Sequence, residues 1–262
     1  SPGGGITDSM RAISLNSGSN GNCWCIEAGG TRLLVDAGIS GIQAETRLAA
    51  YGVDIRSCQG ALISHDHSDH LRSAGILQRK FGLMPWSTSQ TREAGLRCCG
   101  KIADWQVFAE DETVRFGDLR VTAIPTPHDA AGSVAYLFDD GRHRVALLTD
   151  LGHPFAALGD VIAACDGLII ESNYDPRMLA EGPYPLFLQK RISGPAGHLA
   201  NHEAGELVAR HASSRLAWVV LAHLSQENNA PEVALATNRR IVGDRLRLEV
   251  ASRHHACGPF EV

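Results

Sequence analysis

Short apolar runs that end on polar or charged residues recur along the chain. Residues 60–63, Gly-Ala-Leu-Ile, form an apolar run typical of a buried strand, and they lead directly into Ser-His-Asp-His-Ser-Asp-His at 64–70. A polar residue at the end of an apolar strand stands at the edge of a sheet, where it can take part in chemistry. Three further runs, at 121–124, 145–148 and 218–221, lead in the same way to His128, Asp150 and His223.

The periodicity predicts a meander of strands early in the chain and alternating strands and helices later. Residues 23–28 and 31–36 are predicted to pair as a hairpin across Gly29 and Gly30. Further strands are predicted at 10–15, 112–116, 119–124, 133–138, 144–148, 168–170 and 216–221, with a last one at 246–250. Helices are predicted at 42–51, 71–81, 87–97, 154–164, 201–211 and 231–241.

Two of the predicted helices carry more specific signals. Helical spacing brings His70, Ala74, Leu77 and Phe81 to one face of the helix that follows the polar stretch. Asn201 is the predicted N-cap of the helix at 201–211.

No repeat, low-complexity tract or linker divides the chain. We therefore expect one α/β domain over residues 10–262, with two sheets packed face to face and helices outside. Residues 1–9 begin with Ser-Pro-Gly-Gly-Gly, which is typical of a leader or a cloning remnant, and they are left out of this domain.

Composition and charge narrow the possible functions. The chain is 44% hydrophobic and 20% charged, and no apolar run approaches the ~20 residues that cross a bilayer. Its seven cysteines include no Cys-x-x-Cys pair, which favours reduced thiols and a cytoplasmic location. The net charge of −5 disfavours a passive nucleic-acid-binding module. It does not exclude a nuclease, because bound dications would supply positive charge where a phosphate binds. Neither a membrane nor an obligate protein partner is predicted.

The polar stretch at 64–70 has the residue types and spacing of a metal site. Alternate side chains of an extended segment point the same way, so His65 and His67 can bind one ion. Asp69 and His70 then project from the first turn of a helix toward a second position. Imidazole nitrogens and carboxylate oxygens are ligands that Zn²⁺ accepts. With His128, Asp150 and His223, the chain offers the ligand types that a two-metal hydrolase needs.

The stretch at 64–70 resembles the signature of the metallo-β-lactamase superfamily. The resemblance implies a four-layer αβ/βα metallo-β-lactamase sandwich with two divalent ions, Zn²⁺ or Mn²⁺. It implies that Asp36, in Leu-Val-Asp-Ala-Gly, accepts the far ring N–H of a ligand histidine. The implied ligands are His65, His67 and His128 for one ion, Asp69, His70 and His223 for the other, and Asp150 as the bridge.

Longer motifs resemble the YycJ/WalJ-type branch of this superfamily, and the resemblance covers nearly the whole chain from Met10 on. One departure is Ala200, where the branch leads us to expect serine. The branch implies metal-dependent 5′-to-3′ exonuclease activity on DNA, with a metal-activated water oriented by Asp69 or Asp150. The motifs are SGSNGN at 17–22, ESNYD at 171–175, GPYP at 182–185, GHLAN at 197–201 and AHLSQENN at 222–229.

Several polar residues in these motifs are candidates for substrate contacts. His198, in a Gly-flanked loop, is predicted to contact the phosphate or the leaving group and to take part in catalysis. The loop at 17–22 could bind phosphate through its backbone N–H groups. The other candidate contacts are Ser17, Ser19, Asn20, Asn173, Ser225 and Asn228.

Two alternatives to a nuclease stay open on the sequence alone: a hydrolase that acts on another substrate, and a metal-binding protein that is not an enzyme. The same ligands would serve a small-molecule phosphodiesterase, acting on a cyclic diester or a nucleotide, or a thioesterase of glyoxalase II type. The short segment after His223 disfavours the glyoxalase II type, because those enzymes carry a C-terminal helical domain. A non-enzymatic metal-occupied sensor is the third reading, and the complete ligand set with its bridging Asp150 disfavours it.

Overall fold

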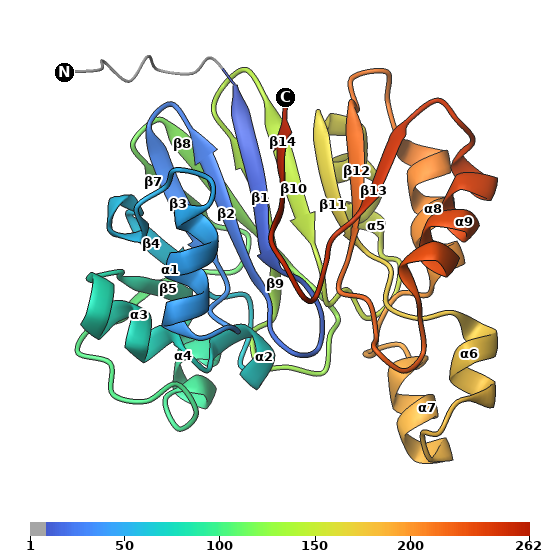
Figure 1. The fold of residues 1–262 in the computed structure, drawn as a ribbon, viewed down its shortest axis with the longest axis horizontal. Helices are drawn as coiled ribbons and strands as arrows, with labels where there is room; N and C mark the ends of the chain where they lie inside the picture. The colour runs from blue at the N-terminus through green and yellow to red at the C-terminus, as the bar shows by residue number, and fades with distance from the viewer. Residues whose placement is uncertain (1–8) are drawn as a thin grey trace.

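The computed structural model describes residues 9–262, in which two sheets pack face to face and helices cover their outer surfaces (Figure 1). This arrangement confirms the four-layer αβ/βα sandwich predicted from the sequence. Apart from Ser9, the expected leader at 1–9 lies outside the described residues.

The first sheet is built from the amino-terminal half of the chain and one strand from its end. β2 and β3 pair antiparallel, which confirms the predicted hairpin. β3 to β6 run parallel, so β3 and β4 end at the same edge. The order is β14 (Cys257–Glu261), β1 (Met10–Asn16), β2 (Cys23–Ala28), β3 (Thr31–Val35), β4 (Gly60–Leu62), β5 (Pro85–Thr88) and β6 (Gln106–Phe108).

The second sheet is built from residues 113–250. β10 to β13 are parallel to one another, whereas β8 and β9 are antiparallel neighbours. β9 is antiparallel to β10 as well as to β8, so β8 runs in the same direction as β10. The end of β8 therefore lies at the same edge as the ends of β10, β11 and β12. The order is β13 (Arg247–Val250), β12 (Trp218–Ala222), β11 (Gly167–Glu171), β10 (Arg144–Leu148), β9 (Val134–Asp139), β8 (Leu119–Pro125) and β7 (Thr113–Phe116).

Three apolar layers hold the sandwich together. The layer between the sheets contains large, fully buried rings, among them Trp24, Tyr136 and Trp218. A second layer joins the first sheet to α1 (Gly41–Ala49) and α3 (Ala74–Phe81). A third joins the second sheet to α5 (Ala156–Ala164), α8 (Asn201–His211) and α9 (Pro231–Val242). Each sheet is thus covered on both faces, which agrees with the continuous apolar runs of β4, β10 and β12.

The helix predicted at 71–81 is interrupted in the structure. It consists of α2 (Ser68–Leu71) and α3, separated at Arg72 and Ser73. The amide of Ser73 donates to the carbonyl of Ala37, a tertiary hydrogen bond that replaces a helical one. The face predicted from the spacing is still the buried one, because His70, Ala74, Leu77 and Phe81 are all buried.

Other local predictions need correction at element ends. Residues 87–97 begin in β5, and Thr88 caps α4 (Ser89–Gly95). Asn201 is the first residue of α8, and Ala200 occupies the N-cap position. The strand at 247–250 is followed by β14, whose Gly258 and Pro259 are typical of a loop and so concealed it.

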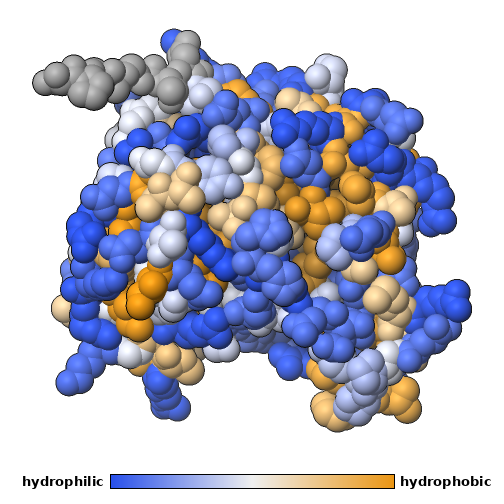
Figure 2. All heavy atoms as spheres, in the orientation of Figure 1, coloured by the Kyte–Doolittle hydropathy of each residue, from blue (hydrophilic) through white to orange (hydrophobic). Residues whose placement is uncertain are grey.

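Two helices, α6 (Pro176–Glu181) and α7 (Leu186–Ile192), were not predicted. α7 buries none of its side chains fully, and Leu186 and Phe187 are 72% and 74% exposed. Helices are predicted from the apolar face that they bury, and α7 has no such face. Figure 2 shows the apolar colour of this region at the lower right of the molecule, where Figure 1 places α7. Among residues 9–262, no helix has the length and apolar character needed to span a bilayer.

β14 links the two sheets, which gives a test of the fold. Phe260 is 1% exposed and lies 5.7 Å, centroid to centroid, from Trp218, whose indole N–H donates to the carbonyl of Glu261. We expect Phe260→Ala to lower the free energy of unfolding by about 3–5 kcal/mol because it leaves a cavity between the sheets. Urea unfolding of the metal-free protein measures this change. The control Phe187→Ala, at an exposed position, should stay within about 0.5 kcal/mol; equal effects of the two substitutions would contradict the assignment.

Candidate metal centre

Strand ends from both sheets meet at one edge of the sandwich, and the predicted ligands stand there. β4 leads through Ser64 to the polar stretch and α2. In the other sheet, β8, β10 and β12 lead to His128, Asp150 and His223. The two sheets are also joined at this edge, because the amide of Val134 donates to the carbonyl of Ser64. Residues that are far apart in the sequence thus reach one place.

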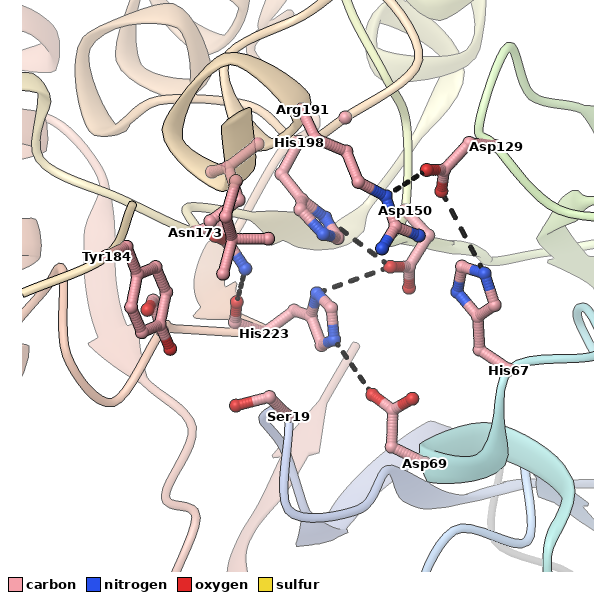
Figure 3. A pocket seen from close by; sticks show the side chains of 14 residues that line it. Ser19, His67, Asp69, Asp129, Asp150, Asn173, Tyr184, Arg191, His198 and His223 are labelled. Carbon is pink, nitrogen blue, oxygen red and sulfur yellow. Dashed lines mark hydrogen bonds and ion pairs between the residues drawn. The ribbon is translucent and has the colours of Figure 1, made fainter. Parts of the chain in front are cut away.

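Three site residues have left-handed backbones within two residues of the end of a strand. Asp36, Asp150 and His223 have φ of 64°, 55° and 56°. Such values are uncommon outside glycine and tend to occur at functional sites, where the surroundings hold them. The fourth such residue between 9 and 262, Asp111, lies in the loop before β7. The left-handed turn ends the extended path, and Figure 3 shows Asp150 and His223 directed into a common centre.

The first set of ring nitrogens belongs to His65, His67 and His128, which lie within 4.8 Å of one another. The Nδ1 of His128 donates to the carbonyl of Gly197 at 2.9 Å. The Nδ1 of His65 lies 2.9 Å from the hydroxyl of Ser64. Both contacts engage Nδ1 and leave Nε2 directed toward the centre as a ligand atom.

The second set is Asp69, His70 and His223, again within 4.8 Å of one another. The Nδ1 of His70 donates to Asp36 at 2.7 Å, the contact that the resemblance implied. The Nε2 of His223 lies 3.6 Å from Asp69. Figure 3 shows Asp69 and His223 facing each other across the cleft.

Asp150 lies between the two sets. Its carboxylate is 3.3 Å from the Nε2 of His70, 3.6 Å from the Nε2 of His128 and 3.4 Å from the Nδ1 of His223. One carboxylate therefore reaches both groups of histidines, as a bridging ligand would.

The unpartnered atoms of the cluster fit two divalent ions. Within residues 9–262, the buried atoms His65 Nε2, His223 Nε2 and Asp150 Oδ2 have no hydrogen-bond partner. Buried polar atoms are rarely left without a partner, and imidazole and carboxylate are ligands for divalent zinc. Two dications would bind these ligand atoms, and the carboxylate of Asp150 would be shared between the two ions.

The charges around His223 favour a proton on it when no metal is bound. Burial disfavours the imidazolium, but the carboxylates of Asp150, Asp69 and Glu171 outweigh this effect and raise the pKa of His223 to about 10. For His65, burial and the neighbouring His70 lower the pKa well below its usual value. Metal binding therefore displaces a proton from His223, whereas His65 is already neutral.

Glu171, at the end of β11, was overlooked as a site residue in the sequence. It is fully buried, and one carboxylate oxygen accepts from the Nδ1 of His198 at 2.7 Å and lies 3.1 Å from the Nδ1 of His223. The other oxygen accepts from the amides of Leu151 and Leu199. Burial opposes ionisation of Glu171, but the nearby His198 and His223 hold its pKa well below the usual value. A carboxylate ending a fully apolar run was the signal that could have identified it.

A cleft of about 230 Å³ opens over the cluster (Figure 3). Four of the predicted substrate contacts line it: Ser19, Asn173, His198 and Ser225. Asn173 also donates to the carbonyl of His223 at 2.7 Å, so it supports the ligand loop as well.

The other three predicted contacts do not line the cleft. The hydroxyl of Ser17 accepts from the amide of His223 at 2.9 Å, and the Nδ2 of Asn20 donates to the carbonyl of Arg253. Asn228 is buried and donates to the hydroxyl of Ser225 from its amide and from its side chain. These side chains hold the loops in place.

Four of the six backbone N–H groups in the predicted phosphate-binding loop at 17–22 already donate to acceptors within the protein. The amide of Gly18 donates to the side chain of Asn22, and the amide of Gly21 donates to the carbonyl of Gly18. The amide of Asn22 donates to the carbonyl of Asp69 at 2.7 Å. The side chain of Asn22 adds contacts of 3.3 Å to the Asp69 carboxylate and 3.0 Å to the Nε2 of His70. The loop therefore orients a metal ligand.

Residues in and just before α7, a helix that was not predicted, complete the wall of the cleft. Tyr184 and Arg191 line it, and the Nε of Arg191 donates to Asp129 at 2.5 Å. Asp129 in turn lies 3.6 Å from the Nε2 of His128 and 3.9 Å from the Nε2 of His67. The charge of Arg191 is therefore neutralised beside the first histidine set.

Comparison with known proteins agrees with this geometry. The Beta-lactamase superfamily domain matches residues 31–223, a span that contains Asp36 and all seven candidate ligands. The metallo-β-lactamase fold protein YhfI from Bacillus subtilis superposes with a TM-score of 0.75 at 18% identity, covering 97% of this chain and 100% of that one. The chain therefore belongs to the metallo-β-lactamase superfamily.

Two closer relatives define its branch. Exodeoxyribonuclease YycJ of Bacillus anthracis is 33% identical over 233 residues, covering 88% of each chain. Exodeoxyribonuclease WalJ of Streptococcus pneumoniae is 34% identical over 227 residues, covering 85% of this chain and 84% of that one. Within the superfamily, this chain lies in the YycJ/WalJ branch, as the motifs indicated.

Asp150 gives the sharpest test of the two-metal assignment. We expect Asp150→Ala, after saturation with Zn²⁺ or Mn²⁺, to hold fewer than two ions per chain, because two dications would lack a shared anion. Glu171→Gln is the matched comparison; it alters a contact behind His223 and should weaken metal affinity by about 10- to 100-fold. Elemental analysis and circular dichroism measure ion content and fold. Two tightly held ions in a folded Asp150→Ala protein would remove Asp150 from the ligand set.

Proposed function

We propose that this metal-dependent hydrolase cleaves phosphodiester bonds in DNA from the 5′ end, in the cytoplasm, with two Zn²⁺ or Mn²⁺ ions. The observation that carries the proposal is the joining of His65, His67, Asp69, His70, His128, Asp150 and His223 beneath one open cleft. The choice of DNA is supported by the names of the two relatives that match over most of the chain. All seven cysteines are unpaired thiols, as expected in a reducing compartment.

The bound ions would supply two effects: they would lower the pKa of water toward ~7 and neutralise charge developing on the phosphoryl oxygens. The protein contributes orientation. Asp69 is half-buried, and its contacts with Asn22 fix the carboxylate at the floor of the cleft. Asp69 and Asp150 can accept hydrogen bonds from the attacking water and align it with phosphorus.

His198 is placed to hold a proton for the leaving oxygen. Its Nδ1 donates to Glu171 at 2.7 Å, which fixes the orientation of the ring and leaves Nε2 for the substrate. Its side chain is 20% exposed and lines the cleft, whereas the ligand His223 is 3% exposed. We assign the imidazolium form of His198, which carries a proton on each ring nitrogen, as the general acid that passes the Nε2 proton to the departing oxygen.

Substrate choice is tested with a 5′-labelled linear DNA duplex beside a covalently closed circle of the same sequence. We expect the linear DNA to lose its 5′ nucleotides first and the circle to survive, because a 5′ exonuclease needs an end. Equal loss of both DNAs would mean endonuclease activity. Stability of both, with rapid cleavage of bis(p-nitrophenyl) phosphate, would favour a small-molecule phosphodiesterase, and hydrolysis of a thioester alone would favour a thioesterase.

The role of His198 is tested with His198→Ala. We expect both metals to be retained and turnover to fall by roughly 10²–10⁴-fold, the usual effect of losing acid–base assistance. The loss should be smaller for a diester with a p-nitrophenolate leaving group, which needs little protonation. Metal loss would make His198 a ligand, and an unchanged rate on DNA would exclude it from catalysis.

A further inference from the structure

Arg253 lies on the boundary between the catalytic cleft and a second hollow. The second hollow has a volume of about 400 Å³, and Ser225 lines both spaces. Arg253 lines the second hollow, and its guanidinium reaches Ser19, a residue of the cleft wall, at 3.3 Å. Figure 3 shows Ser19 and Tyr184 on the side of the cleft opposite His67 and Asp129. A chain leaving the cleft on this side would pass the guanidinium.

The charge of Arg253 is not neutralised by any carboxylate contact. Its guanidinium donates to the side chains of Gln226 and Ser19 and to the carbonyl of Leu224, which are all neutral acceptors. It makes no ion pair within residues 9–262, and burial lowers its pKa in spite of the opposing charge of Glu227. Arg191, the other arginine at the cleft, is instead paired with Asp129. A half-buried cation with neutral partners is stabilised when an anion joins it.

The backbone that carries Arg253 is fixed. Asn20 donates to the carbonyl of Arg253 at 2.9 Å, and Arg47 donates to the carbonyl of His254 at 2.8 Å. The amide of Ser17 donates to the carbonyl of Ser252 at 3.0 Å. Gly18 makes room for the guanidinium, since a Cβ there would stand 2.7 Å from its Nη2. The loop therefore presents the guanidinium in a set position.

We propose that Arg253 binds the phosphate next to the one being cleaved, so that the second hollow holds the continuing nucleic acid strand. A guanidinium has five N–H donors, and the contacts above use three of them, so two remain for phosphate oxygens. The serine hydroxyls of residues 19 and 225 flank the path between the two spaces. This inference rests on the proposed function, because it requires a substrate with more than one phosphate. The adjacent phosphate can be internal or 5′-terminal.

The test compares substrates that differ by one phosphate. These are a dinucleoside monophosphate, the same dinucleotide with a 5′-terminal phosphate, and a trinucleotide with two internal phosphates. For the wild-type protein, kcat/KM should rise when the second phosphate is added, and the substrate that gives the rise identifies its position. For Arg253→Ala this rise should be lost, which lowers kcat/KM on two-phosphate substrates by about 10- to 100-fold. For a longer strand, the slope of the logarithm of the binding constant against the logarithm of the salt concentration should become shallower by about one unit in Arg253→Ala.

Two further variants separate phosphate binding from support of the loop. Arg253→Lys keeps the cation without the planar guanidinium and should recover part of the gain. Arg215→Ala removes an exposed arginine that is paired with Asp166, before β12 and outside the cleft lining, and should keep the whole gain. Thermal melting and metal content of each variant are measured alongside.

The outcomes are distinguishable. An equal loss on one-phosphate and two-phosphate substrates by Arg253→Ala would show that Arg253 only holds the loop, which overturns the inference. An undiminished gain in Arg253→Ala would also overturn it. If the wild-type protein cleaves none of the nucleotide substrates but cleaves bis(p-nitrophenyl) phosphate, the proposed function itself fails.

Discussion

The carboxylate of Asp150 lies within 3.6 Å of four imidazoles, and that meeting depends on how the two sheets pack against each other. His70 comes from the first sheet, and the other three come from separate loops of the second. Burial opposes the charge of Asp150, but the surrounding His223, His70 and His128 keep its pKa below the usual value. A shift of one sheet against the other would separate these charges, so the apolar layer between the sheets also sets the geometry of the metal centre.

A second ring of polar groups keeps the inner residues in place. Asp36 and Glu171 each accept from the Nδ1 of a histidine and so fix the orientation of its ring. Below the ligand loops, Asn229 donates to the side chain of Asn201 and to the carbonyls of Ser172 and Asn173. Much of the motif that marks the branch is thus a scaffold of buried amides. It fixes the backbone that carries the ligands and leaves few of its side chains free for substrate.

The features of this protein that could be predicted are those that depend on neighbouring residues in the sequence. The apolar runs and the polar residues after them predicted the strands and the ligand positions, because a strand exposes its last side chains wherever it ends. Glu171 and Asn22 were not predicted as site residues, since their roles depend on partners more than twenty positions away. Asn201 was misassigned because an asparagine before a helix is usually a cap, whereas here tertiary contacts with Ser172 and Asn229 take its side chain.

The loop at 17–22 forms one wall of the cleft, yet its closure depends on the far end of the chain. Asn20 bonds to Arg253 across 233 positions, and Ser17 bonds to His223 and Ser252. Contacts between such distant residues are slow to form during folding. During synthesis, every ligand has therefore emerged before the loop can acquire its last partners. This wall of the cleft is therefore completed by residues that follow every candidate ligand in the chain, so a change near the carboxyl-terminal end can alter the cleft while all seven ligands stay in place.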